Sequence, residues 1–100
     1  MVTCYTKLLV LDSLTGRYIR ISVDELKKSM RILNNLKKHR ENKTVTLSDY
    51  CEIMGMFPVV PGDMVGWVKS VKRIDWNLTL SIRNDLLIFN LYVTDPEFFI

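Results

Sequence analysis

The chain contains little of what metal centres and disulfide frameworks require. Its 100 residues include one histidine, His39, and two cysteines, Cys4 and Cys51, which lie far apart. Zinc sites combine several Cys and His ligands at short, characteristic spacings, and no such spacing occurs here. The sequence therefore predicts no metal site and no cofactor, and it favours two reduced cysteines that behave as small apolar residues.

Long apolar runs are also missing. No stretch approaches the roughly 18 apolar residues that a membrane-spanning helix needs. The N-terminal segment MVTCYTKLLVLDS has neither the basic region nor the cleavage site of a secretory signal. Because 48% of the residues are hydrophobic, a real core is expected. We therefore predict a single cytoplasmic domain over residues 1–100 with no membrane association.

Catalytic constellations are absent from the sequence pattern. His39 lies in the polar stretch KKHREN, and its pairing with Cys51 has no supporting motif. Asp63 and Asp75 are too weak a signal for paired-carboxylate chemistry, and PGDMVG lacks the glycine spacing of a phosphate-binding loop. The sequence predicts a protein that is not an enzyme, and a small hydrolase or metal-dependent enzyme remains the third hypothesis.

The first half of the chain predicts a hairpin and a long helix. Two strand-like runs within residues 3–22 flank a turn that contains Gly16. The tetrapeptide SVDE, from Ser22 to Glu25, is a capping box that begins a helix over residues 23–40. Its apolar stripe repeats every three or four residues and comprises Val23, Leu26, Met30, Leu33 and Leu36, widened by Ile32. Lys37 falls outside this stripe.

A second capping signal, TLSD, begins a short helix over residues 47–55, which Gly55 ends. A loop over residues 56–66 follows, in which Gly66 permits a close approach of two backbones. The C-terminal part predicts a hairpin over residues 67–94 with its two-residue turn at Asn84–Asp85. The register that pairs apolar residues on one face is Ile82 with Leu87, Leu80 with Phe89, Leu78 with Leu91 and Trp76 with Val93.

These elements predict the α+β class. We expect an antiparallel sheet of about four or five strands, with one long amphipathic helix and one short helix packed on one face. VGWVKSV would add a strand before the last hairpin, and the apolar tail EFFI would cover the core or a second subunit.

Charge is distributed unevenly along the chain. The net charge is +3, yet residues 17–43 alone hold nine bases against three acids. One hypothesis is a small nucleic-acid-binding protein that uses the basic helix 23–43 to neutralise phosphates. A solvated helix face is the alternative, because no aromatic residues are interleaved there for base stacking. The candidate residues are Lys27, Lys28, Arg31, Lys37, Lys38 and Arg40.

Three pieces in the second half of the chain form a recognisable pattern: TVTLSDYCEIMGM, the turn GDMVGW from Gly62 to Trp67, and the strand beginning IDWNL. Through these pieces, residues 44–93 resemble a family of small uncharacterised proteins from phages and mobile elements of Gram-positive and gut bacteria. The resemblance implies a phage, prophage or conjugative-element setting. It implies no activity and no functional residue.

The leading functional hypothesis is a non-enzymatic protein-interaction module, with inhibition of a host protein or an adaptor role as versions of it. The predicted partner-binding residues are Trp67, Phe57 and Asp63, in or beside the 56–66 loop. Trp67 has two interpretations, an exposed interface anchor or a core residue beneath the loop. A homodimer formed through strand edges is a further expectation.

Overall fold

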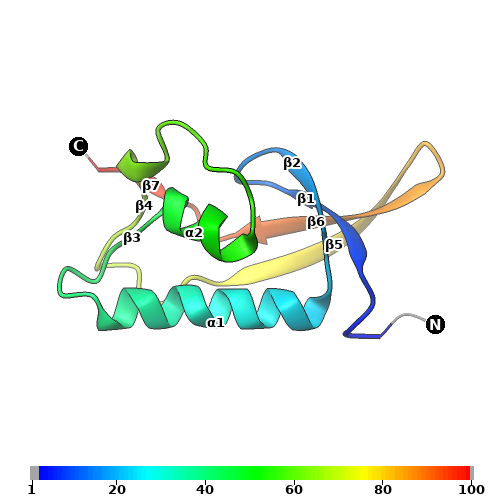
Figure 1. The fold of residues 1–100 in the computed structure, drawn as a ribbon. Coiled ribbons are helices and arrows are strands. Elements are labelled where there is room, and N and C mark those ends of the chain that lie inside the picture. The colour runs from blue at the N-terminus through cyan, green and yellow to red at the C-terminus, as the bar shows by residue number, and fades with distance from the viewer. Residues whose placement is uncertain (1–2, 100) are drawn as a thin grey trace.

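The computed structural model describes residues 3–99 and has an α+β fold (Figure 1). This confirms the predicted class, with one long and one short helix. The elements along the chain are β1 (Leu8–Asp12), β2 (Arg17–Ile21), α1 (Val23–His39), β3 (Val45–Thr46), α2 (Leu47–Met54), a 3-10 helix (Gly62–Met64), β4 (Val65–Trp67), β5 (Trp76–Arg83), β6 (Leu86–Val93) and β7 (Glu97–Phe98).

The strands form two sheets. The larger sheet has the order β2-β1-β6-β5, and its central pair, β1 and β6, is parallel. The smaller sheet has the order β3-β4-β7. The larger sheet is therefore mixed, whereas the sequence predicted an antiparallel one. Local turn signals fix the two hairpins, but the way the hairpins dock depends on burying Val10 against the core near Leu91.

The register of the last hairpin agrees with the prediction at every pair. Leu78 lies opposite Leu91, and Trp76 lies opposite Val93. Asn84 and Asp85 both have positive φ angles, 51° and 65°, which the two-residue turn requires. The far end of this hairpin projects beyond the body, so the molecule is 44 Å long but only 24 and 21 Å across (Figure 1).

The stretch around Gly66 does not extend the hairpin. Instead, β4 pairs with β3 on one side and β7 on the other. A Cβ on Gly66 would lie 2.1 Å from the carbonyl oxygen of Val45, which confirms the predicted close backbone approach. The predicted apolar tail supplies β7 from Glu97 and Phe98; Ile100 lies outside the described residues.

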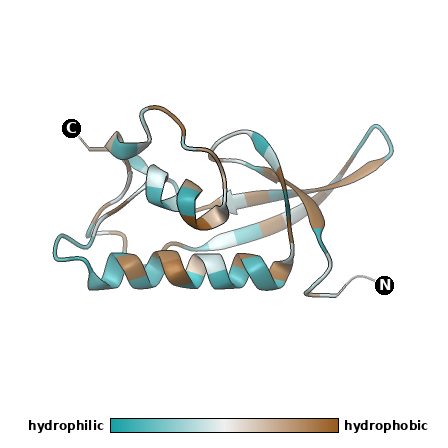
Figure 2. Cartoon of the chain, in the orientation of Figure 1, coloured by the Kyte–Doolittle hydropathy of each residue, from teal (hydrophilic) through white to brown (hydrophobic). Residues whose placement is uncertain are grey.

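Helix α1 begins as predicted, with both hydrogen bonds of the Ser22–Glu25 capping box present. It covers one side of the fold, and its hydrophobic and hydrophilic residues alternate along its length (Figure 2). Leu26, Met30 and Leu33 are buried, as expected. Ile32 is exposed, however, and Lys37 is buried. The predicted stripe was wrong at these two positions. Lys37 is buried because the segment before β5 lies against its side of the helix.

Helix α2 places an aromatic pair at the centre of the core. Tyr50 and Trp67 are fully buried, and their ring centroids are 5.9 Å apart. The Tyr50 hydroxyl donates a hydrogen bond of 2.7 Å to the buried carboxylate of Asp12. The Trp67 indole nitrogen donates to the carbonyl oxygen of Thr94 at 2.6 Å. The second interpretation of Trp67 therefore holds: this residue is part of the core.

Candidate functional site

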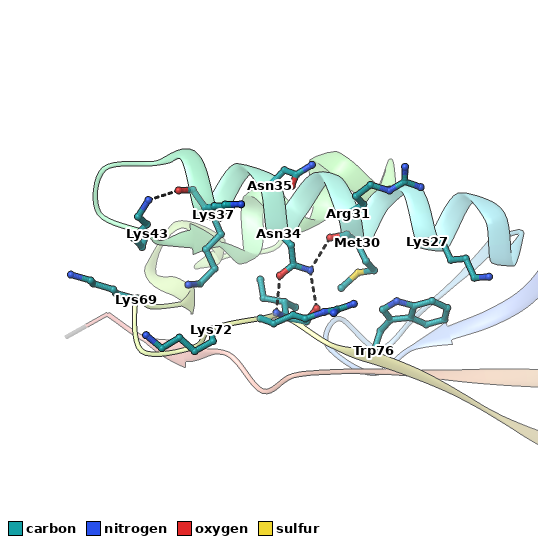
Figure 3. A pocket seen from close by; sticks show the side chains of 13 residues that line it. Lys27, Met30, Arg31, Asn34, Asn35, Lys37, Lys43, Lys69, Lys72 and Trp76 are labelled. Atoms are coloured by element: carbon teal, nitrogen blue, oxygen red, sulfur yellow. Dashed lines mark hydrogen bonds between the residues drawn. The ribbon is translucent and has the colours of Figure 1, made fainter.

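A groove of about 780 Å³ runs between α1 and the irregular segment 68–75 that leads into β5. Figure 3 shows how its side chains converge from the helix above and the segment below. The lining residues are Lys27, Met30, Arg31, Asn34, Asn35, Lys37, Lys38, Lys43, Lys69, Lys72, Arg73, Ile74 and Trp76.

The charge of this groove has one sign. Eight of its lining residues are lysine or arginine, and no acidic residue among those that the structure describes lines it. Since the chain has fourteen bases and eleven acids, the rest of the molecule holds six bases and eleven acids, a formal charge of −5. A protein with a net charge of only +3 thus concentrates its positive charge on one concave surface.

Asn34 holds the two walls of the groove together. Its side-chain oxygen accepts from the Ile74 amide at 2.8 Å, and its side-chain nitrogen donates to the Ile74 carbonyl at 2.9 Å. The same nitrogen also donates to the Met30 carbonyl at 2.9 Å (Figure 3). These bonds fix the segment before β5 against α1, so the groove's width is set by the fold.

Lys37 occupies an unfavourable position for a cation. Its residue is only 5% exposed, and within residues 3–99 it forms no ion pair. Burial lowers the pKa of its ammonium group, and the positive charges of Lys72 and Lys43 lower the pKa further. Lys43 in turn donates a hydrogen bond to the Lys38 carbonyl, and this bond holds the Lys43 ammonium at the end of the groove near the C-terminus of α1. A bound anion would relieve the repulsion among these three lysines.

Trp76 lies at the opposite end of the groove from Lys43 and Lys69 (Figure 3). It is half-buried, because it packs partly against the core at the start of β5. The rest of its ring lines the groove. One groove therefore combines a cluster of ammonium groups with an aromatic surface.

The predicted basic residues divide into two groups. Lys27, Arg31, Lys37 and Lys38 line the groove. Lys28 and Arg40 do not: Lys28 pairs with Asp24 at 3.2 Å, and Arg40 pairs with Asp49 at 2.6 Å. Within residues 3–99, the four predicted residues in the groove form no ion pair, whereas Lys28 and Arg40 are each paired with an acidic residue.

The protein-interaction residues also separate in the structure. Trp67 is in the core, whereas Phe57 and Asp63 are exposed on the loop above α2. Phe57 is 86% exposed, and its neighbour Val60 is 97% exposed. This loop is largely hydrophobic in Figure 2, so an apolar surface remains there without Trp67.

Neither a metal centre nor a membrane segment is found in the part of the chain that the structure describes. No group of three or more His, Cys, Asp or Glu residues within residues 3–99 could hold a metal ion. Over the same residues, neither helix has the length and apolar character that crossing a bilayer demands.

The chain belongs to the family of unknown function DUF6353. The family model matches residues 1–97, and thus includes the N-terminal hairpin and the basic helix as well as the part that the sequence resemblance covered. No curated protein and no solved structure matches the chain. The groove must therefore be interpreted from its own chemistry.

Sequence reasoning missed half of the groove. Lys69, Lys72 and Arg73 lie in the segment KSVKRIDW, directly before Trp76. Three bases next to a tryptophan are the signal that could have found them. Their contribution remained hidden because the prediction considered the basic helix alone, and only the fold brings this segment to the helix.

Proposed function

We propose that the protein binds single-stranded nucleic acid in the groove between α1 and the segment 68–75. The observation that carries this proposal is the convergence of eight cationic side chains and one tryptophan on one concave surface. Proteins that bind single strands combine a positive groove that follows the phosphates with aromatic side chains on which bases stack.

The lysine-rich end of the groove is suited to phosphate. Lys37, Lys43 and Lys72 repel one another there, and a phosphate between them would replace repulsion with attraction. Because Lys37 is largely withdrawn from water, this interaction would be screened less by salt than a contact on an open surface.

Trp76 would contact a base rather than a phosphate. Base–aromatic stacking contributes about 1–3 kcal/mol per base and tolerates any sequence. The Asn34 amide, which could otherwise read a base edge, is already occupied by Met30 and Ile74. We therefore expect binding with little sequence preference.

A recognition helix in the major groove of duplex DNA fits this molecule less well. Such helices present their N-terminal residues to the bases. The first turn of α1 carries Asp24 and Glu25, whose negative charge opposes approach to phosphates, and Glu25 is already engaged with Ser22 and Lys7. The groove lies along the later turns of the helix.

The experiment is a binding titration with a short fluorescein-labelled oligo(dT) and oligo(U), followed by fluorescence anisotropy over a range of salt concentrations. Lys72→Glu should weaken binding more than about tenfold, because phosphate contacts dominate affinity. Lys28→Glu is the matched control: it makes the same charge change at a residue that is paired with Asp24 outside the groove. Its affinity should stay within about twofold of the wild type, since salt screens distant charges.

Equal losses in the two variants would contradict a specific groove, and absence of binding at low salt would contradict nucleic-acid binding altogether. Duplex DNA of the same length serves as the competitor. If duplex binds more tightly than the single strand, the assignment to single strands is wrong.

The setting we propose is the cytoplasm of a bacterium that carries a phage or mobile element. It is supported by the resemblance of residues 44–93 to small proteins of such elements. Single strands of phage or element nucleic acid are accessible in that compartment, and the groove would bind them whatever their sequence.

A second candidate function is binding to a host or element-encoded protein, which would include an inhibitor or adaptor role. It is favoured by the exposure of Phe57 and Val60 on a loop held above α2. Replacing both by serine should abolish capture of a protein that the wild type retains at high salt after nuclease treatment. Lys72→Glu should leave that capture intact, so the two functions are separable.

A further inference from the structure

The outer edge of β5 is long and unprotected. β5 is the last strand of the larger sheet, it has eight residues, and from Trp76 to Ile82 it contains no charged residue, proline or glycine. The opposite edge strand, β2, has five residues and carries Arg17 and Arg20. Proteins usually protect an exposed edge with short strands or charges, because its free backbone groups can pair with another strand.

The backbone bonds show which residues face this edge. Thr94 donates from its amide to the Asp75 carbonyl at 2.9 Å, so Asp75 and every second residue after it bond to the β6 side. The amides and carbonyls of Trp76, Leu78, Leu80 and Ile82 consequently point outward. Just before them, Asn34 bonds both backbone groups of Ile74. The edge is therefore occupied up to Ile74 and free from Trp76 onward.

We propose that two copies of this chain associate by antiparallel pairing of their β5 edges, with the two-fold axis at Thr79. In this register Leu78 lies opposite the second copy's Leu80, and Trp76 lies opposite the second copy's Ile82. Asp75 lies opposite the second copy's Arg83. Each of these contacts occurs twice, because a two-fold interface repeats every pair.

Charge complementarity selects this register. Antiparallel pairing that keeps the apolar residues on one face can also place the axis at Leu80. That arrangement sets Arg83 opposite the second copy's Asn77 and carries Trp76 past the end of β5 to Asn84 in the turn, so neither Asp75 nor Arg83 gains a partner of opposite sign on the second strand. With the axis at Thr79, both copies of the Asp75–Arg83 pair join charges of opposite sign.

The pairing also accounts for apolar residues that one copy leaves in water. Leu80 and Ile82 are 56% and 70% exposed on the part of the hairpin that projects from the body. In the dimer they lie beside the second copy's Leu78 and Trp76, which pack against its core. The projecting arm of each copy thus extends the apolar face of the other.

Disulfide trapping tests the axis directly. A cysteine at Thr79, with the exposed Cys4 replaced by serine, would lie opposite itself in a pair with a Cα separation of about 4.5 Å, which is within disulfide range. Asn77→Cys in the same background is the control: it faces the same way on β5, but the two copies of residue 77 would be about 13 Å apart. We expect a covalent dimer from Thr79→Cys alone. A covalent dimer from Asn77→Cys alone, or from neither variant, overturns the proposal.

Analytical ultracentrifugation of a charge exchange gives an independent test. Arg83→Asp turns two attractions into repulsions and should raise the dimer dissociation constant about tenfold. Asp75→Arg combined with Arg83→Asp should restore it. A wild-type monomer at every concentration, or a double variant no better than Arg83→Asp, overturns the proposal. Arg83 lies outside the groove, whereas Asp75 pairs with the groove residue Arg73 at 3.1 Å, so the sedimentation is measured without nucleic acid and reports the dimer alone.

Discussion

The core around Tyr50 and the groove around Lys37 both remove polar side chains from water, but among the described residues only the core supplies the buried ones with hydrogen-bond partners. In the core, the Asp12 carboxylate accepts hydrogen bonds from the Tyr50 hydroxyl at 2.7 Å and from the Thr15 hydroxyl at 2.6 Å. In the groove, the buried Lys37 has like charges as its neighbours. A buried polar group with partners supports the fold, whereas a buried charge beside like charges opposes folding.

This difference separates structural residues from candidate functional ones. Sites that act on ligands often hold groups in environments that would be unfavourable without the ligand. Asp12, Tyr50 and Trp67 have hydrogen-bond partners within the fold, so their substitution should reduce stability. The groove lysines have no acidic partner within residues 3–99, so their substitution should reduce binding while stability stays the same or rises. Substitutions in the two regions should therefore separate loss of stability from loss of binding.

Gly66→Ala should cause the greatest loss of stability. Its Cβ would lie 2.1 Å from the Val45 carbonyl oxygen and 2.7 Å from the Thr46 Cα, both of which are backbone atoms that cannot rotate away. We expect a destabilisation of more than about 3 kcal/mol, as for other strongly disruptive substitutions. Urea unfolding followed by circular dichroism would measure it.

Gly16→Ala provides the matched control for this prediction. Gly16 has a φ of +70° but no atom within 4 Å of its added Cβ, so only backbone strain of about 1–2 kcal/mol is expected. Equal losses from the two substitutions would show that the small sheet separates to accept the methyl group, contrary to the tight approach seen at Gly66.

Tyr50→Phe tests the buried polar pair. Removing the hydroxyl leaves one oxygen of the fully buried Asp12 without its donor, and an unsatisfied buried group costs about 1–3 kcal/mol. Thermal unfolding should show a clear decrease in Tm, whereas Tyr18→Phe at an exposed position should change Tm little. A Tyr50→Phe variant as stable as the wild type would mean that the carboxylate does not depend on this bond.

Asp49→Asn tests a charge that does have a partner. Burial raises the pKa of Asp49, but hydrogen bonds from Arg40 and from Thr46 outweigh burial and hold this pKa below its usual range. Its stabilisation is therefore present above the unfolded-state pKa of about 4 and is lost as the pH falls through the folded-state value. We expect Asp49→Asn to cost roughly 1–2 kcal/mol at neutral pH.

The pH dependence makes this prediction specific. Urea unfolding of the wild type and Asp49→Asn should converge at low pH, where the wild-type carboxyl is protonated and no longer pairs with Arg40. Asp63→Asn, at an exposed position, should match the wild type throughout. A difference that persists at low pH would assign the effect to the helix cap rather than to the charge.

The sequence predicted local structure well where the chemistry is local. The capping boxes at Ser22 and Thr46 and the turn at Asn84–Asp85 depend on neighbouring residues, and all three form. The parallel pairing of β1 with β6 and the small sheet around Gly66 join segments far apart in the chain. No spacing rule reports such pairings, because they depend on how the hairpins and helices pack together.

The candidate site shows the same limit. Lys37 looked like one of many solvent-facing lysines on an amphipathic helix. Its burial follows from the segment before β5, which Asn34 fastens to α1 through Ile74. Lys28 and Lys37 therefore have equivalent charges in the sequence but opposite positions in the structure, one paired on the surface and the other enclosed by the groove.

Lys37→Met gives the smallest change in stability and the sharpest test of the comparison. The pKa of Lys37 is lowered first by burial and then by Lys72 and Lys43, so its folded-state pKa lies below the unfolded-state value. Its charge therefore opposes folding at neutral pH, and this effect fades as the pH rises through the folded-state pKa. Methionine keeps an unbranched apolar stem without the charge, and we expect about 0.5–1 kcal/mol of added stability.

Binding should change in the opposite direction. The same Lys37→Met variant should lose oligonucleotide affinity. An excess of oligo(dT) should then raise the Tm of the wild type above that of the variant, because a ligand stabilises a folded protein more when it binds that protein more tightly. Lys38→Met, at the adjacent exposed position, should leave stability unchanged. If Lys37→Met lowers both stability and affinity, Lys37 is a structural residue, and the contrast between core and groove is lost. If stability rises while affinity falls, the ammonium of Lys37 destabilises the folded protein, and its place in the groove is explained by the anion that it binds.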